Sequence, residues 1–306
     1  MKKVTFLLLL VSMFLTGCSS STTASQKTNS SQETTAKVQK KTTEDKTAST
    51  TATQNISAEE LSKWTYNSGD NSVKVLNSDQ PNTIKATDFE QAHIDYGGLD
   101  NLNRTKTATA YLTRNNLGKS ETRTEQTWRP TGWHNQPKNV NGERVFPQNR
   151  GHLIAYTMTF NLNKSGQAQQ GQLGSIDNPY NLFTQTEFSN QKTMTETEQM
   201  VRTALAQNKK VIYQVTPIFR GNELMARGVW VQAISTDGSL KFNRYLWNVQ
   251  NNIVFDYATG RSSLDTSFTV PAVANSYNNN RNYHKKYQKH HKYYRHHKRS
   301  SIKSVF

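Results

Sequence analysis

Three things are scarce in this sequence: cysteine, long apolar runs and hydrophobic residues in general. Cys18 is the single cysteine among 306 residues, so no disulfide can form within the chain. The longest mostly apolar run covers twelve residues, 4–15, too few to cross a bilayer as a helix. Hydrophobic residues make up 33% of the chain and the mean hydropathy is −0.82, which excludes one packed globule over the whole length.

Acidic residues are also missing from one part of the chain. Residues 266–306 carry nine Lys or Arg and no Asp or Glu, and residues 1–55 carry seven against three. The middle, 56–265, is nearly balanced, with 22 basic and 19 acidic residues. The net charge of +16 therefore belongs mainly to the two ends and says little about the middle.

The first eighteen residues have the pattern of an export signal. Lys2 and Lys3 precede the apolar run, and Leu15-Thr16-Gly17-Cys18 follows it. A small residue before a lone cysteine resembles the lipobox of bacterial lipoproteins, which implies that Cys18 is lipidated. We expect the protein at the extracellular face of the cell membrane, anchored there through Cys18 or shed by cleavage further along. The alternative is a plain secretory signal with an incidental cysteine.

Composition divides the rest of the chain into three parts. Residues 19–55 contain 18 Ser or Thr among 37 positions, which predicts a disordered tether. Aromatic and aliphatic residues return over 56–270, enough for a single domain. Residues 271–306 form a basic tail with five of the eight histidines, which predicts a second disordered segment. Its charge and tyrosines suit nucleic acid or anionic cell-wall polymers, and it could equally be only solvated chain.

The domain has both strand and helix signals, which predicts an α+β fold. The runs 211–215, 228–234, 242–249 and 253–257 are rich in β-branched and aromatic residues, and Thr216-Pro217 should end the first. Between Phe188 and Gln207 there is no Gly or Pro, and apolar residues recur at helical spacing. We expect one helix ending near Asn208, with Glu198 and Arg202 on one face and Asn190 about 80° away around the axis.

The most informative stretch is Arg150-Gly151-His152, which follows a polar loop. Gly151 should let the backbone turn tightly so that His152 points into a site. Taken alone, these residues are commoner in ordinary surface loops. The stretch is followed by Asn178-Pro179-Tyr180-Asn181, then Asn190-Gln191, then Glu198 and Arg202.

In this order, these blocks resemble the DNA/RNA non-specific endonucleases of the ββα-metal class, in particular the exported nucleases of Gram-positive bacteria. Similarity extends from Pro130-Thr131-Gly132-Trp133-His134 to the run 211–216 and covers roughly residues 95 to 260. The resemblance implies a ββα-metal core on a central, mainly antiparallel sheet. It implies an Mg²⁺-dependent enzyme, with Mn²⁺ as an alternative, that cuts DNA, with RNA as a second substrate class.

The resemblance also assigns roles to residues. It makes His152 the general base that activates water, and Asn190 the direct protein ligand of the metal. Glu198 would orient metal-bound water, Arg202 would stabilise the phosphate, and Asn181 would help to shape the metal site. Arg150 is counted with the catalytic residues. Mg²⁺ prefers oxygen ligands and keeps several waters, which fits a site with one amide ligand.

Each of these residues also has an ordinary structural explanation. Glu198 and Arg202 could be a solvent-exposed helix pair, and the asparagines could be turn or cap residues. Trp133 and Trp230 are more often core residues than ligand platforms. One departure concerns Asn149, because the common motif has Asp there. If that Asp fixes the histidine or tunes its basicity, Asn149 would weaken the base somewhat. Asn keeps the acceptor and the size, so we expect activity to remain. The competing functions are a surface lipoprotein with a decayed site that binds nucleic acid through its tail, and an adhesin. No protein partner is implied.

Overall fold

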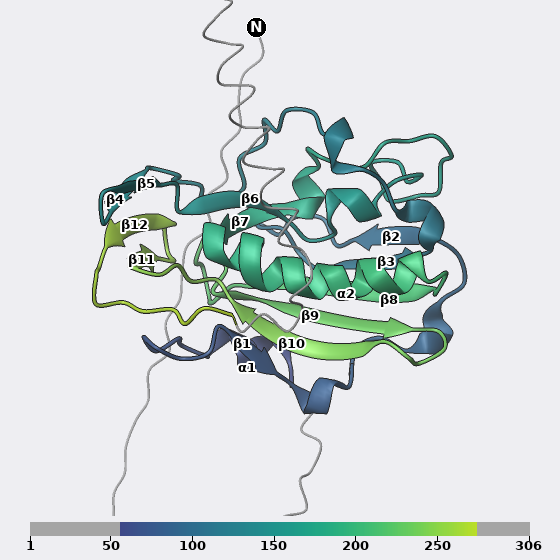
Figure 1. Cartoon of the computed structure of the whole chain (residues 1–306), viewed down its shortest axis with the longest axis horizontal. Helices are drawn as coiled ribbons and strands as arrows, with labels where there is room; N and C mark the ends of the chain where they lie inside the picture. Colours follow the sequence, from purple (N-terminus) through teal and green to yellow (C-terminus); the bar gives the residue numbers. More distant parts are fainter. Residues whose placement is uncertain (1–55, 274–306) are drawn as a thin grey trace, which may run out of the picture. The chain divides into compact units, whose positions relative to one another are not determined.

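The structure is a computed structural model, and it describes residues 56–273. The predicted signal peptide with Cys18, the predicted tether, and the tail from residue 274 onward lie outside the described residues. The domain boundaries at 55 and 270 therefore remain predictions. The elements of the described part are shown in Figure 1.

A six-stranded sheet forms the centre of the domain, with the strand order β1-β10-β9-β8-β3-β2. Every neighbouring pair is antiparallel, which confirms the predicted α+β fold with a mainly antiparallel sheet. In sheet order the strands are Val73–Val75 (β1), Lys241–Trp247 (β10), Gly228–Ser235 (β9), Val211–Ile218 (β8), Ala108–Leu112 (β3) and His93–Tyr96 (β2).

The prediction that β8 ends at Thr216-Pro217 is wrong, because the strand continues through Pro217 to Ile218. Proline cannot donate a hydrogen bond to a neighbouring strand. The pairing of β8 with β3 stops at Val215, so beyond that point β8 is paired only with β9. The missing N–H of Pro217 is therefore tolerated on the unpaired side of the strand.

The sheet is covered on both faces. Along β10, Leu246 belongs to one buried apolar cluster, whereas Tyr245 and Trp247 belong to another. The first cluster also contains Val201 and Leu205 of α2 (Thr195–Ala206), and the second contains Leu61 of α1 (Ala58–Ser62). Because alternate residues of a strand point to opposite faces, the three consecutive apolar residues Tyr245, Leu246 and Trp247 are buried on both faces of the sheet.

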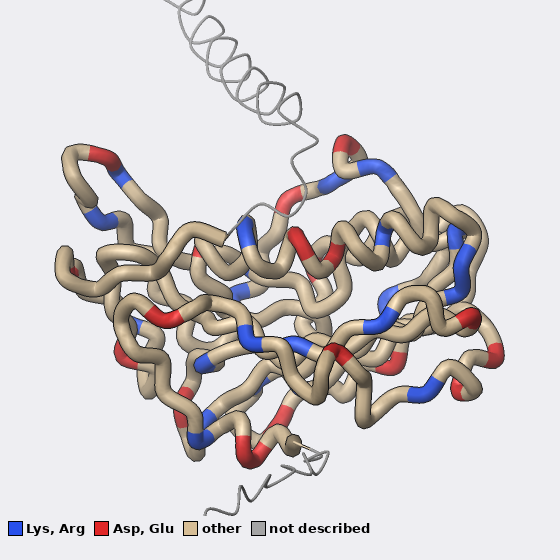
Figure 2. The backbone as a smooth tube through the Cα atoms, turned by 60° about the horizontal axis from the view of Figure 1, so that its bottom comes forward, with Lys and Arg blue, Asp and Glu red and all other residues tan. Residues whose placement is uncertain are grey.

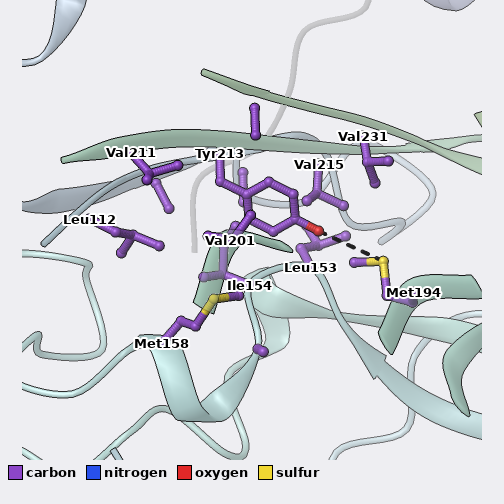
Figure 3. Close-up of a cluster of buried hydrophobic side chains, with 14 of the residues drawn as sticks. Leu112, Leu153, Ile154, Met158, Met194, Val201, Val211, Tyr213, Val215 and Val231 are labelled. Atoms are coloured by element: carbon purple, nitrogen blue, oxygen red, sulfur yellow. Dashed lines mark hydrogen bonds between the residues drawn. The ribbon is translucent and has the colours of Figure 1, made fainter. Parts of the chain in front are cut away.

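The core below α2 is drawn in Figure 3. The Tyr213 hydroxyl points to the sulfur of Met194 at 3.9 Å, among valine, leucine and methionine side chains. Tyr213 and Val201 are fully buried. This packing fixes α2 against β8 and β9, and Figure 1 shows the helix lying over these strands.

A strand pair and a helix next to the main sheet contain most of the predicted site residues. Strand β6 (Gln148–His152) pairs antiparallel with β7 (Leu182–Thr186). A π-helical segment, Ser189–Met194, then leads into α2. Asn208 has φ of 62°, so the helical stretch ends where the sequence predicts.

The stretch is helical, as predicted, but it is not one unbroken α-helix, because the six residues Ser189–Met194 are π-helical. The hydroxyl of Thr193 donates to the carbonyl of Ser189 at 3.0 Å, and the hydroxyl of Thr195 donates to the carbonyl of Asn190 at 3.1 Å. Side-chain hydrogen bonds of this kind compete with the regular backbone ladder. The angle of about 80° between Asn190 and Glu198, which assumes an unbroken α-helix, therefore does not apply.

The remaining elements are short. Strands β4 (Lys138–Val140) and β5 (Glu143–Val145) form a hairpin whose two loop residues, Asn141 and Gly142, both have positive φ, as a type I′ turn requires. Strands β11 (Ile253–Asp256) and β12 (Arg261–Leu264) form another pair. Short 3₁₀ segments lie at Asn77–Asp79, Ala86–Asp88, Arg114–Asn116, Ser120–Thr122, Tyr156–Met158 and Pro179–Asn181.

Along the backbone of the described domain, Lys and Arg positions are interspersed with Asp and Glu positions, as Figure 2 shows. This agrees with the near balance of basic and acidic residues over 56–265. Within residues 56–273, no helix is long and apolar enough to cross a membrane.

Candidate active site

His152 is the last residue of β6, opposite Leu182 of β7. Its Nε2 atom lies 3.1 Å from the carbonyl oxygen of Ile176. A carbonyl oxygen can only accept a hydrogen bond, so Nε2 carries the proton of the neutral imidazole. The lone pair of the ring is then on Nδ1, where it can accept a proton.

The surroundings of His152 keep its ring neutral. Burial lowers its pKa to about 4, and the positive charge of Arg123 acts in the same direction. The hydrogen bond to Ile176 and the charge of Asp177 raise the pKa, but by less. At neutral pH, His152 is therefore an unprotonated base with a free Nδ1 lone pair.

Gly151 has a different role from the predicted one. It lies inside regular strand β6, paired with Phe183, and makes no tight turn. A Cβ atom at this position would overlap the side chain of Gln185. Glycine is required here because Gln185 packs directly against the β6 backbone.

Asn181 and Arg150 both hold the strand that carries His152. The fully buried amide of Asn181 accepts from the N–H of Ile154 and donates to the Ile154 carbonyl, each at 2.9 Å. Arg150 donates from Nε to the carbonyl of Trp128 at 2.6 Å, and its guanidinium lies 4.8 Å from the ring centre of Trp133. Trp230, by contrast, is a core residue, as expected.

Glu198 and Arg202 form an ion pair on α2, with 3.1 Å between Oε2 and Nη1. Their side chains are only 14% and 22% exposed, so the pair is not the solvent-exposed one that the sequence alone would favour. Burial raises the pKa of Glu198, while the charges of Arg202 and Arg123 oppose that rise. A partly buried carboxylate is thus held beside two cations.

Arg123 is the residue that connects these elements, and it does not stand out in the sequence. Its charge acts on His152 at the end of β6 and on Glu198 on α2. It lies in the loop after the 3₁₀ segment Ser120–Thr122, with its guanidinium 5.5 Å from the ring centre of Tyr156. A lone arginine in a polar loop carries no spacing signal, so only the fold could identify it.

Asp177 is the second such residue. Its carboxylate accepts hydrogen bonds from Thr127 and Trp128, and its charge acts on His152. Asn149 is placed differently. Residues 148, 150 and 152 share one face of β6 in this regular pairing, so Asn149 lies on the opposite face from His152.

Asn190 and Glu198 provide oxygen atoms suited to a hard divalent cation. Asn190 lies in the π-helical segment, is half-buried, and its side-chain amide makes no hydrogen bond to any of residues 56–273. Glu198 has one carboxylate oxygen on Arg202 and the other unbonded within the same range. Within residues 56–273, no three or more His, Cys, Asp or Glu side chains lie close enough together to hold a metal ion. Amide and carboxylate oxygens with water are a donor set that fits Mg²⁺.

The chain is similar to known nucleases in both sequence and fold. A family model described as DNA/RNA non-specific endonuclease matches residues 81–237, just over half of the chain. The structure is similar to NucA from Streptococcus agalactiae in crystal structures with a magnesium ion bound and with no metal bound. In both comparisons the sequences are 32% identical, and the matched region covers 63% of this chain and 87% of the NucA chain. The TM-score is 0.54 for the structure with magnesium and 0.53 for the structure without metal.

Proposed function

This chain belongs to the DNA/RNA non-specific endonuclease family and is an endonuclease; we propose that it hydrolyses phosphodiester bonds of DNA, and of RNA as a second substrate class, with His152 as general base. The observation that carries the mechanism is the neutral imidazole of His152, whose Nε2 is bonded to Ile176 and whose Nδ1 makes no hydrogen bond within residues 56–273. A base in this state can take a proton from the attacking water at neutral pH.

The cationic side chains supply the second requirement of the reaction. Phosphodiester hydrolysis builds negative charge on the phosphate, and fixed positive groups stabilise it in a site of low dielectric. Arg202 is paired with Glu198 at 3.1 Å, and the charge of Arg123 acts on both Glu198 and His152. We assign to Arg202 the role of stabilising the charge on the phosphate, and to Arg123 a supporting role in the same site. Arg150 and Asn181 act as positioning residues, because their polar atoms are bonded to the backbone.

We propose Asn190 as the direct protein ligand of a divalent cation and Glu198 as the residue that orients its water. Mg²⁺ is the proposed ion and Mn²⁺ the alternative. The oxygen donors of the two residues support this assignment, as does the magnesium ion bound in the similar NucA structure. When bound, such an ion polarises the phosphoryl oxygens and offsets the charge that develops on them.

The cellular setting is proposed from the sequence. Export by residues 1–18 and lipidation of Cys18 would place the enzyme at the extracellular face of the cell membrane, from which cleavage in 19–55 would shed it. The basic tail would retain nucleic acid or anionic cell-wall polymers near the enzyme. Its proposed partners are thus nucleic acid, the membrane and wall polymers.

Digestion of supercoiled plasmid by the full-length chain tests the function. We expect rapid nicking and degradation with Mg²⁺, and loss of both with EDTA or in His152→Ala. His93→Ala is the matched control, since His93 also bonds a backbone carbonyl, at 3.0 Å from Gln91, but stacks on Tyr111 at the β2 edge of the sheet. Retarded but intact plasmid in every lane would contradict the proposal and leave a surface protein that only binds nucleic acid.

A further inference from the structure

Two loop segments meet beside His152 and are fastened together by one carboxylate. Asp177 accepts from the N–H and the hydroxyl of Thr127 at 3.0 and 2.6 Å, and from the N–H of Trp128 at 2.9 Å. Burial alone would raise the pKa of Asp177, but these bonds and the charge of Arg150 lower it below its usual range. The carboxylate is therefore ionised near neutral pH, and both of its oxygens accept hydrogen bonds.

Both functional side chains of β6 are bonded to the two segments that Asp177 joins. His152 donates to the carbonyl of Ile176, next to Asp177, and Arg150 donates to the carbonyl of Trp128. Gln126 adds a further link, with Nε2 2.9 Å from the same Ile176 carbonyl. The positions of both acceptor carbonyls thus depend on the contact between 126–128 and 176–177.

We propose that Asp177 is a further positioning residue of this active site, because its carboxylate fixes the carbonyls of Ile176 and Trp128. The Ile176 carbonyl holds His152 in its Nε2–H tautomer, and the Trp128 carbonyl holds Arg150 in place. The proposal rests on the proposed role of His152 as general base. The tautomer matters because the base needs its lone pair on Nδ1, and the Ile176 carbonyl permits only that form. A neutral histidine without this acceptor exchanges between both tautomers.

Charge supports the same role. The groups that act on the His152 ring are its burial, Arg123, the Ile176 carbonyl and Asp177, and Asp177 is the acidic one among them. Its negative charge opposes the effect of Arg123 on the same ring. A carboxylate at position 149 would lie on the other face of β6 from the ring, so Asp177 is the acidic residue placed to act on it.

The test compares Asp177→Asn and Asp177→Ala with Asp265→Asn in the full-length chain. Asp265 is a matched control, because its carboxylate also accepts from a backbone N–H and a hydroxyl, those of Ser267 at 3.0 and 2.6 Å, away from the site. Plasmid cleavage gives kcat and KM. Nitrogen-15 NMR of the imidazoles, with the His152 signals assigned by their loss in His152→Ala, gives the tautomer.

We expect kcat to fall by about 10-fold to 100-fold in both Asp177 variants, with KM within about 3-fold of wild type, as misplacement of a catalytic group predicts. The His152 signals should show Nε2–H alone in wild type and a mixture of tautomers in both variants. Asp265→Asn should change neither readout. Asp177→Asn is nearly isosteric, so it carries the test if Asp177→Ala does not fold.

Two results would overturn the proposal: kcat of Asp177→Asn within about 3-fold of wild type, or a lower kcat with an unchanged His152 tautomer. Failure of the proposed function looks different. A wild-type protein that cuts no plasmid contradicts the role of His152 as base, whereas the NMR comparison still decides whether Asp177 orients the ring.

Discussion

The carboxylate of Glu198 and the guanidinium of Arg202 are joined at 3.1 Å on α2, in a pair that is largely withdrawn from solvent. The charge of the neighbouring Arg123 also acts on this carboxylate. One carboxylate oxygen is bonded to Arg202, and the other has no hydrogen bond within residues 56–273. The pair thus holds the Arg202 guanidinium in place and leaves one Glu198 oxygen available to a ligand.

Glu198→Gln should reduce kcat by about 10-fold to 100-fold, the range typical for loss of a residue that orients the water or ligands of a metal. Its control is Glu223→Gln, which breaks a comparable pair with Arg227 at 2.8 Å whose side chains are 15% and 19% exposed. The control should affect the unfolding temperature but not kcat. Equal losses of activity in the two variants would show that Glu198 serves only the stability of the domain.

The activity of the wild-type enzyme on acidification should be limited by Glu198 rather than by His152. Burial raises the pKa of Glu198 from its usual 4.5, whereas burial and Arg123 lower that of His152 to about 4. As the pH falls, Glu198 is therefore protonated first and His152 later. The kcat/KM profile of Glu198→Gln should lose its activity at lower pH than that of wild type. An unchanged acid limb in this variant would assign the limb to another group.

The same shift in His152 makes folding stability depend on pH. The folded pKa of about 4 lies below the usual 6.5, so the folded state binds fewer protons, and stability falls as the pH drops from 6.5 towards 4. At 1.36 kcal/mol per pKa unit, the loss is at most about 3 kcal/mol. Urea unfolding of wild type and His152→Gln at pH 7 and pH 4.5 measures it. The variant should lose less stability over this interval, and equal losses would contradict the lowered pKa.

Asn190→Ala should raise the Mg²⁺ concentration for half-maximal activity by at least about 10-fold, because a direct ligand contributes more than the outer groups whose loss costs 10-fold to 100-fold. Asn139→Ala, on exposed strand β4, is the control and should leave the metal requirement unchanged. A titration of plasmid cleavage against Mg²⁺ gives both values. The assignment fails if Asn190→Ala lowers kcat at every Mg²⁺ concentration without moving the midpoint.

The fold could be predicted from the sequence where local composition or spacing carried the signal. The strands β8 to β11 follow from runs of β-branched and aromatic residues, and the helical stretch ending at Asn208 follows from apolar residues at helical spacing. The π-helical segment of that stretch could not be predicted in this way. There, the hydroxyls of Thr193 and Thr195 donate hydrogen bonds to backbone carbonyls, and spacing does not reveal these bonds. The ends of a strand depend on its pairing with neighbouring strands and not only on its own sequence. The extension of β8 past Pro217 is an example, because the pairing of β8 with β3 has already ended at Val215.

The candidate site divides in the same way. His152, Asn190, Glu198 and Arg202 lie in short blocks whose order could be compared with a family. Arg123 and Asp177 come from loops, where neither spacing nor residue type distinguishes a site residue from a solvated one. Their relation to His152 exists only after the chain brings 123–128 and 176–177 to the end of β6. The sequence predicts a tight turn at Gly151, whereas the structure shows that glycine is needed there because the Gln185 side chain leaves no room for a Cβ atom.

Asn149→Asp restores the residue that the common form of the motif has before Arg-Gly-His, and it tests whether a carboxylate there acts on the base. The regular pairing of β6 with β7 puts position 149 opposite Gln185 and on the other face from His152. We therefore expect kcat/KM to stay within about 3-fold of wild type, a change below 1 kcal/mol. The nitrogen-15 titration of His152 should also give an unchanged pKa. An increase in that pKa together with faster cleavage would mean that the carboxylate reaches the ring, and that Asn149 weakens the base as the motif alone suggests.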